Sequence, residues 1–350
     1  MPLVIIACAH MTSFLVITID VAIVLVLALF VFGLFFIIKG GDFLVRAALS
    51  LNKISGINQV IIGATFVSVA TTLPEVFVSI FAVAADNHGI AVGNALGAMT
   101  ANIALVLALP IAFLPSGVKR GEVFGKSIFL LVVTVIVFLF ALNLQVSWYE
   151  GTILLAAFAV FIIYNIFVGT RRCEPVVPKP LCRSVSQEKT ANRYAYLKIA
   201  AGFIIGQVML IFGAFTLVEN GEKLAHLFGI SETVVGFTII AIGTSLPELT
   251  TAIISIRRKS GGLAVGNVIG ANVINCTLLL GVCGIIGDIK GVSLPVSRET
   301  VFIAIPVLIA LTLIAVLPML IRGRAYKWQG FLLLAAYAAY VSYLAIAQPV

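Results

Sequence analysis

The stretch ATTLPEVFVS, residues 70–79, places a proline and a glutamate inside an apolar run that is long enough to cross a bilayer. The stretch GTSLPELTTA, residues 243–252, repeats this arrangement at an offset of 173 residues. A proline disrupts helical hydrogen bonding, and a carboxylate is costly at membrane depth. Two such costly elements in both copies predict a polar site within a membrane.

The composition predicts an all-α integral membrane protein. The 350 residues are 61% hydrophobic and 10% charged, with a mean hydropathy of +1.19, which is more apolar surface than a soluble core buries. A spanning helix needs about 20 mostly apolar residues. Ten segments meet this requirement, with approximate centres at Leu25, Leu73, Ala101, Val135, Phe158, Gln207, Pro247, Cys276, Leu308 and Ala338. We expect a first five-helix half over residues 1–168, a loop over 169–197 and a second half over 198–350.

Basic residues predict the orientation of these spans. When successive loops are assigned to alternate sides, only Lys223, Lys290 and Arg298 of the 22 lysines and arginines fall on one side. The positive-inside rule makes the lysine-rich and arginine-rich side cytoplasmic. Both termini and the minor side are therefore expected outside, with the 169–197 loop in the cytoplasm. The net charge of +8 is explained by this topology and by attraction to anionic lipid, without nucleic acid.

Two smaller features concern the chain start and the cysteines. The first nineteen residues are apolar but lack the basic start of a signal peptide, so they either extend the first span or precede a start at Met11. The five cysteines form no CxxC pair and are interpreted as reduced and structural.

The two copies of the repeat are predicted to have opposite orientations. Residues 63–107 align without a gap with residues 236–280, and the shared features include Leu-Pro-Glu, Ala-Val-Gly-Asn and a distal asparagine. The offset separates equivalent elements by five spans, and an odd number inverts one copy relative to the membrane. Inverted repeats with broken helices near the midplane are typical of secondary transporters.

The residues around the prolines predict an all-oxygen cation site. Pro74 and Pro247 free carbonyl oxygens around Ala70 and Gly243, and unpaired carbonyls are tolerated at membrane depth where they line a cavity. Calcium takes six to eight oxygen ligands. Inverted symmetry is expected to bring two clusters face to face, with carboxylates and hydroxyls from Glu75, Glu248, Thr71, Thr72, Thr244 and Ser245.

The second part of each repeat is expected to support this site. Gly93, Gly97, Gly266 and Gly270 have a spacing that lets helices pack closely in lipid, and we interpret them as packing residues. The distal asparagines, Asn102 and Asn275, either clip helices together or offer an amide to a glutamate or an ion.

These motifs resemble those of the sodium/calcium exchanger superfamily in its short prokaryotic form, over nearly the whole chain. The resemblance implies alternating access, in which the first and sixth spans slide past a core of the other eight. It implies a calcium site formed by Glu75, Glu248, Thr71 and Thr244. It implies flanking sodium sites formed by Thr72, Ser245, Asn102, Asn275 and backbone carbonyls near Ser68 and Ala241.

The chain departs from the family pattern at four positions. Ala98 and Ala271 stand where sodium-coupled relatives often have a serine, and Asn275 stands where many have an aspartate. Met99 replaces the amide that its repeat partner Asn272 retains. Fewer oxygens and one fewer acid predict a smaller number of monovalent ions per calcium.

The leading interpretation is a calcium/sodium antiporter of the plasma membrane, acting in calcium extrusion. The alternative is a calcium/proton antiporter that uses the same glutamates, because facing carboxylates are also neutralised by protons. An enzyme would need a nucleophile with a positioned base, and a channel would more naturally repeat its elements around the pore axis. We expect no cofactor and no enzymatic activity, and as partners only calcium, monovalent cations and membrane lipids, with no nucleic acid and no obligatory protein.

Overall fold

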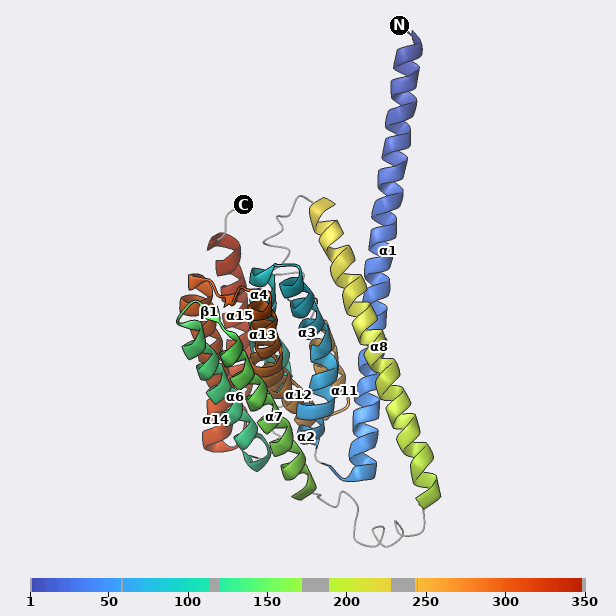
Figure 1. The fold of residues 1–350 in the computed structure, drawn as a ribbon. Coiled ribbons are helices and arrows are strands. Elements are labelled where there is room, and N and C mark those ends of the chain that lie inside the picture. Colours follow the sequence, from blue (N-terminus) through green and yellow to red (C-terminus); the bar gives the residue numbers. More distant parts are fainter. Residues whose placement is uncertain are drawn as a thin grey trace.

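The computed structural model describes residues 2–57, 59–113, 120–171, 189–227, 243 and 245–347, and these residues are almost entirely helical (Figure 1). The α-helices are α1 (Pro2–Ser55), α2 (Gln59–Ile62), α3 (Ser68–Ala84), α4 (His88–Ala101), α5 (Ala108–Phe113), α6 (Arg120–Ala141), α7 (Trp148–Arg171), α8 (Lys189–Leu227), α11 (Leu246–Arg257), α12 (Gly261–Ile274), α13 (Leu280–Ile289), α14 (Ile305–Arg322) and α15 (Lys327–Ala347). Short π-helical segments are η1 (Gly63–Val67), η2 (Asn102–Leu107), η4 (Asn275–Leu279) and η5 (Thr300–Ala304). Two-residue strands β1 (Gln145–Val146) and β2 (Leu294–Pro295) pair antiparallel.

Eight helical stretches in the described residues are long and apolar enough to cross a membrane. They are Ile23–Ser55, Gln59–Ala84, His88–Phe113, Val123–Ala141, Trp148–Val168, Tyr194–Gly213, Gly261–Ile289 and Thr300–Arg322. Of the other two expected spans, α15 has 21 residues and so a length of about 30 Å. The span expected around Pro247 includes residues 228–242, which lie outside the described residues. The all-helical membrane class is thus confirmed.

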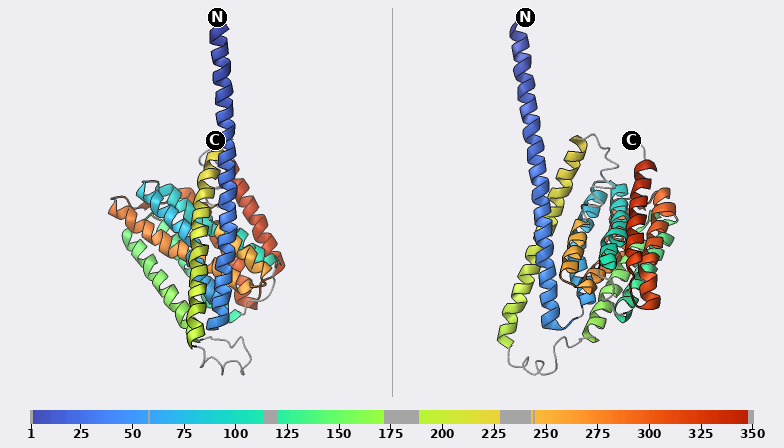
Figure 2. Two further views of the ribbon diagram at one scale, coloured as in Figure 1. Left: turned by 90° about the vertical axis from the view of Figure 1, so that its right-hand side faces the viewer. Right: turned by 180° about the vertical axis from the view of Figure 1, so that it is seen from behind.

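Large apolar side chains cover the outer faces of the bundle. Leu25 is 57% exposed, Phe32 46% and Ile163 65%. Side chains of this kind match a hydrocarbon environment in place of water. The N-terminal part of α1 extends beyond the rest of the bundle as a continuous helix (Figures 1 and 2).

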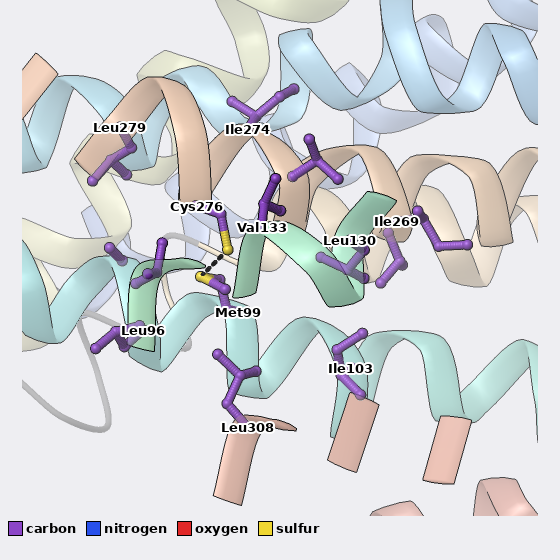
Figure 3. Packing of buried hydrophobic residues seen from close by; sticks show 14 of the residues in the cluster. Leu96, Met99, Ile103, Leu130, Val133, Ile269, Ile274, Cys276, Leu279 and Leu308 are labelled. Carbon is purple, nitrogen blue, oxygen red and sulfur yellow. Dashed lines mark hydrogen bonds between the residues drawn. The ribbon is translucent and has the colours of Figure 1, made fainter. Parts of the chain in front are cut away.

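The larger cluster of buried apolar side chains lies mainly among α3 to α7 and α11 to α15, and a smaller cluster lies where α1 and α8 pack against the bundle. Figure 3 shows part of the larger cluster, where Met99 and Leu130 pack with Ile269 and Leu308 and all four are at most 1% exposed. The thiol of Cys276 donates to the sulfur of Met99 at 3.7 Å. Cys276 and Cys283 are buried free thiols.

Helices α1 and α8 form an antiparallel pair at one side of the bundle (Figures 1 and 2). They approach backbone to backbone at glycines. A Cβ atom added to Gly40 would lie 2.7 Å from the carbonyl oxygen of Gly206, and one added to Gly213 would lie 2.8 Å from that of Gly33. The four glycines are two pairs at the repeat offset of 173 residues, Gly33 with Gly206 and Gly40 with Gly213. Gly40 contacts Gly206, and their repeat partners Gly213 and Gly33 contact each other. This reciprocal arrangement is the pattern of a two-fold contact.

The turns that follow α3 and α11 also match. Asp86 has a φ of 64° and Lys259, its partner at the repeat offset, a φ of 55°. The amide of Asn87 donates to the carbonyl of Ala82, and the amide of Ser260 donates to that of Ser255, both at 2.8 Å. Non-glycine residues rarely adopt this left-handed backbone, so its presence at both equivalent positions reflects the same helix-ending motif.

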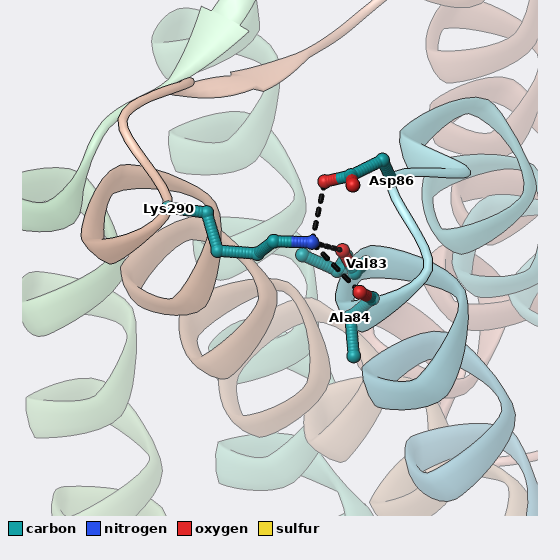
Figure 4. Close-up of polar contacts among 4 residues, drawn as sticks. All are labelled: Val83, Ala84, Asp86 and Lys290. Carbon is teal, nitrogen blue, oxygen red and sulfur yellow. Dashed lines mark hydrogen bonds and ion pairs between the residues drawn. The ribbon is translucent and has the colours of Figure 1, made fainter.

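One of these turns is joined to the end of α13 (Figure 4). The Lys290 ammonium donates to the carboxylate of Asp86 and to the carbonyl of Ala84, the latter at 2.7 Å. This contact ties the α3–α4 connection to the second half of the chain.

Candidate cation-binding site

The proline of the first repeat lies inside helix α3 and leaves one carbonyl without its helical donor. Pro74 lacks an N–H, so the carbonyl of Ala70 cannot receive the usual i to i−4 bond. The side-chain amide of Gln207, on α8, donates to that oxygen at 2.7 Å. The structure corrects the expectation of a helix broken at Pro74, because α3 continues through the proline and the π-helical turn η1 precedes it.

The proline of the second repeat lies at the start of α11. Pro247 occupies the first turn, where a missing N–H costs no helical bond. Ser245 directly precedes the helix and is 3% exposed. Two predicted site residues, Thr244 and Ala241, lie outside the described residues.

The two glutamates are brought together from the two halves of the chain. Glu75 and Glu248 are both 0% exposed, and their carboxyl groups lie close enough to interact electrostatically. Among the described residues, neither carboxylate oxygen of Glu75 has a hydrogen-bond partner. The Oε1 atom of Glu248 accepts from the Thr72 hydroxyl at 3.3 Å, whereas its Oε2 atom has no partner within the same part of the chain. Buried acceptors of this kind need a cation or a proton.

Hydroxyl groups surround these carboxylates. Ser68, Thr71 and Thr72 are all 0% exposed. The Thr71 hydroxyl is within donating distance of two acceptors, the Ser68 carbonyl at 3.4 Å and the Oδ1 atom of Asn267 at 3.3 Å. The hydroxyl of Ser245 has no partner there.

The distal asparagines are at the starts of equivalent π-helical segments. Asn102 begins η2 and Asn275 begins η4, and both are 0% exposed. Within the described chain, neither amide has a hydrogen-bond partner at its oxygen or its nitrogen. An unpaired buried amide costs about 1 to 3 kcal/mol, which favours the interpretation as a ligand over that as a helix clip.

Three polar residues contribute to this site beyond those predicted. The Asn94 amide donates to the Glu75 carbonyl at 3.1 Å and to the Ser79 hydroxyl at 3.0 Å. Its repeat partner Asn267 donates to the Thr251 hydroxyl at 2.9 Å. These two belong to the repeated Ala-Val-Gly-Asn, so the repeat contained the signal.

Gln207 is the third such residue. It is a lone amide in a predicted span, and its repeat partner is Leu34, so the repeat gave no signal for it.

The chemistry of this donor set suits hard cations. The polar atoms named above are carboxylate, hydroxyl, amide and carbonyl oxygens, which are the ligands of calcium and sodium. No group of three or more histidine, cysteine, aspartate or glutamate residues that could hold a metal occurs among the residues described.

A family model and two curated relatives match most of this chain. The family model described as "Sodium/calcium exchanger protein" matches residues 25–167 and 198–346. The chain is 27% identical to the sodium/calcium exchanger MaX1 of Methanosarcina acetivorans, over 88% of this chain and 95% of that relative. It is 34% identical to the inner membrane protein YrbG of Escherichia coli, over 81% of this chain and 87% of that relative.

Solved structures agree. The chain is similar to the sodium-calcium exchanger NCX_Mj soaked with Na⁺ and Sr²⁺, with a TM-score of 0.77 and 27% identity, covering 91% of this chain and 99% of that one. The similarity therefore extends over most of the chain.

Proposed function

The chain belongs to the sodium/calcium exchanger family, and on that premise we propose that it exchanges calcium for sodium across the plasma membrane by alternating access. The proposed direction is calcium extrusion. The observation that carries the proposal is the fully buried pair of Glu75 and Glu248, contributed by opposite halves of the chain. Two buried negative charges are strongly unfavourable unless a cation or protons neutralise them, so the empty site resists reorientation. Transport coupled in this way is an obligatory exchange and requires no enzymatic step and no cofactor.

The proposed calcium ligands are the two glutamates with the hydroxyls of Thr71 and Thr244. Burial of both carboxylates and of Thr71 supports this set. The proposed sodium ligands flank calcium and comprise the side chains of Thr72, Ser245, Asn102 and Asn275 and the carbonyls of Ser68 and Ala241. The unpaired amides of Asn102 and Asn275 and the unpaired hydroxyl of Ser245 support this second set.

The proposed architecture has ten spanning helices in two inverted halves, over residues 1–168 and 198–350, joined by a cytoplasmic loop at 169–197. Both termini then lie outside. The reciprocal glycine contacts between α1 and α8 support this arrangement, as do the matching turns at Asp86 and Lys259. The strong bias of basic residues toward one side supports the orientation.

Charge neutrality also sets the proposed coupling ratio. Calcium, two sodium ions or two protons each neutralise Glu75 and Glu248, whereas a third monovalent ion leaves an excess positive charge because Asn275 replaces an acid. We therefore expect two monovalent ions per calcium. Introducing serine at Ala98 and Ala271 together with aspartate at Asn275 is expected to steepen the sodium dependence of calcium flux. A reversal potential that gives three sodium ions per calcium in the natural protein contradicts the charge argument.

Calcium uptake by proteoliposomes tests the function. Uptake is measured under an outward sodium gradient and, separately, under a proton gradient. Glu75→Gln and Glu248→Gln are each expected to reduce uptake by on the order of a hundredfold or more, because each removes a buried carboxylate from its pairing with the bound cation, and breaking a buried pair of opposite charges costs about 3 to 5 kcal/mol. Glu219→Gln is the matched control, since this glutamate is 67% exposed and pairs with Lys223 at the surface.

Three outcomes distinguish the candidates. Sodium-driven uptake that both buried substitutions abolish supports the proposal. Uptake driven by protons and indifferent to sodium favours the calcium/proton antiporter. Near-normal uptake in either buried variant refutes the site.

A further inference from the structure

The bond between Gln207 and Ala70 breaks the symmetry of the two halves. Ala70 and Gly243 are repeat partners, and each lies four residues before a proline, which has no N–H to donate to its carbonyl. Gln207, which donates to the Ala70 carbonyl at 2.7 Å, has Leu34 as its own repeat partner. Leucine has no hydrogen-bond donor in its side chain. The first half thus has a polar bond that the second half cannot form.

The acceptor of this bond is a buried backbone oxygen that has no helical donor. The Ala70 carbonyl is left without a donor by Pro74, so the side-chain amide satisfies an acceptor that would otherwise stay unpaired. A carbonyl only accepts, so the nitrogen of the Gln207 amide must face it. The Ala70 side chain is 3% exposed, and Gln207 is half-buried.

A second polar contact of the α1–α8 pair is asymmetric in the same way. Asp42 on α1 pairs with Arg258, which follows α11, at 2.7 Å. Their repeat partners are Phe215 and Ala85, which cannot form an ion pair. Both polar contacts therefore belong to one arrangement of the α1–α8 pair against the remaining helices.

The α1–α8 pair is also packed unequally against the two halves of the bundle. Helix α1 packs against α11 more extensively than α8 packs against α3. In alternating access between inverted halves, the other transport state would have α8 packed more extensively against α3 than α1 against α11. A shift of one helical turn, about 5.4 Å, takes Gln207 out of reach of the Ala70 carbonyl, and Leu34 offers no equivalent bond to Gly243.

We propose that Gln207 is a positioning residue that holds the α1–α8 pair in the arrangement described here, by its bond to Ala70, and so makes the two transport states unequally populated. This inference rests on the alternating access of the proposed function. Loss of one hydrogen bond of this kind shifts the ratio of the two states by about three- to tenfold. In this role the residue acts on the state of the carrier through its bond to Ala70.

Distance measurement between two spin labels tests the proposal. In a cysteine-free background, labels are placed at Tyr194 on α8 and at Ile321 on α14, which are 75% and 62% exposed. Double electron–electron resonance in liposomes then gives the populations of the two arrangements directly. Gln207→Leu restores the symmetry, and Gln207→Met keeps the side-chain length. Each is expected to raise the population of the minor distance relative to that of the major distance by about three- to tenfold.

Two further variants complete the design. Combining Gln207→Leu with Leu34→Gln provides the opposite bond to Gly243 and should shift the ratio further in the same direction. Leu34→Met is the matched control, which adds no donor, and should leave the ratio unchanged.

The outcomes separate this inference from the proposed function. If both substitutions of Gln207 leave the distance distribution as in the parent protein, whether it has one component or two, the positioning role is wrong. If the populations shift but calcium uptake occurs under neither a sodium nor a proton gradient, the proposed function fails and the positioning role stands.

Discussion

The close crossing of α1 and α8 allows a prediction whose size follows from the structure. In Gly40→Ala the new Cβ would lie 2.7 Å from the Gly206 carbonyl, 2.9 Å from the Leu210 amide nitrogen and 3.0 Å from the Met209 Cβ. Ordinary contact begins near 3.4 Å, so the helices must separate by about 0.7 Å. None of these neighbours is the flexible end of a side chain, so no rotamer change relieves the clash. Overpacking of this kind costs about 1 to 3 kcal/mol.

A second glycine provides a matched control. In Gly202→Ala, on α8, the new Cβ meets only the Cβ of Ala47, at 3.8 Å. Both substitutions gain the same helix propensity, about 1 kcal/mol, so the difference between the two variants isolates the clash. At about 2 to 4 °C per kcal/mol, Gly40→Ala should unfold roughly 2 to 12 °C below Gly202→Ala.

The buried thiols of Cys276 and Cys283 supply the assay. A thiol-reactive dye reports their exposure during heating, in a background where the other three cysteines are serine. Both variants are heated at one rate, because the unfolding temperature of an irreversible transition depends on that rate. Equal unfolding temperatures for the two variants would refute the claim that backbone contact at Gly40 joins these helices.

Three other predictions concern the membrane orientation, the ion pair of Asp86 with Lys290, and Asn94 of the first repeat. A cysteine introduced at Asn87 should react with an impermeant thiol reagent from outside and one at Ser184 only from the cytoplasmic side, and the reverse order would contradict the orientation. Lys290 lowers the pKa of Asp86, so this pair stabilises the fold above the ordinary value of 3.8 and the contribution is lost as the pH falls through the lowered pKa. The difference in stability between the natural protein and Asp86→Asn should therefore shrink in acid, and a difference constant with pH would contradict it. Asn94→Ala should raise the calcium concentration that gives half-maximal uptake about tenfold, because the Asn94 amide holds the Glu75 backbone.

The sequence was sufficient to predict the membrane class and the central pair of acids. Hydropathy predicted the eight helical stretches that are long and apolar enough to cross a membrane, and the repeated Leu-Pro-Glu pointed to Glu75 and Glu248, which the fold buries next to each other. Both signals are local or repeated, so they are visible without coordinates.

The tertiary hydrogen bonds were not predictable in this way. The bond from Gln207 joins residues 137 apart, and its acceptor is a backbone atom that no side-chain pattern reveals. The same bond explains why α3 continues through Pro74, because a donor from another helix satisfies the carbonyl that the proline leaves unpaired. Helix propensity describes only the chain's own turn and cannot include such a donor.

The reciprocal glycine contacts between α1 and α8 have a consequence for the origin of such a chain. Gly33 meets Gly213 and Gly40 meets Gly206, so each partner presents the same patch to the other. Two separate half-length polypeptides inserted in opposite directions would form the same contact as a dual-topology homodimer. Joining the halves fixes that antiparallel partnership at one to one, and it frees each half to diverge, as Gln207 and Leu34 have done.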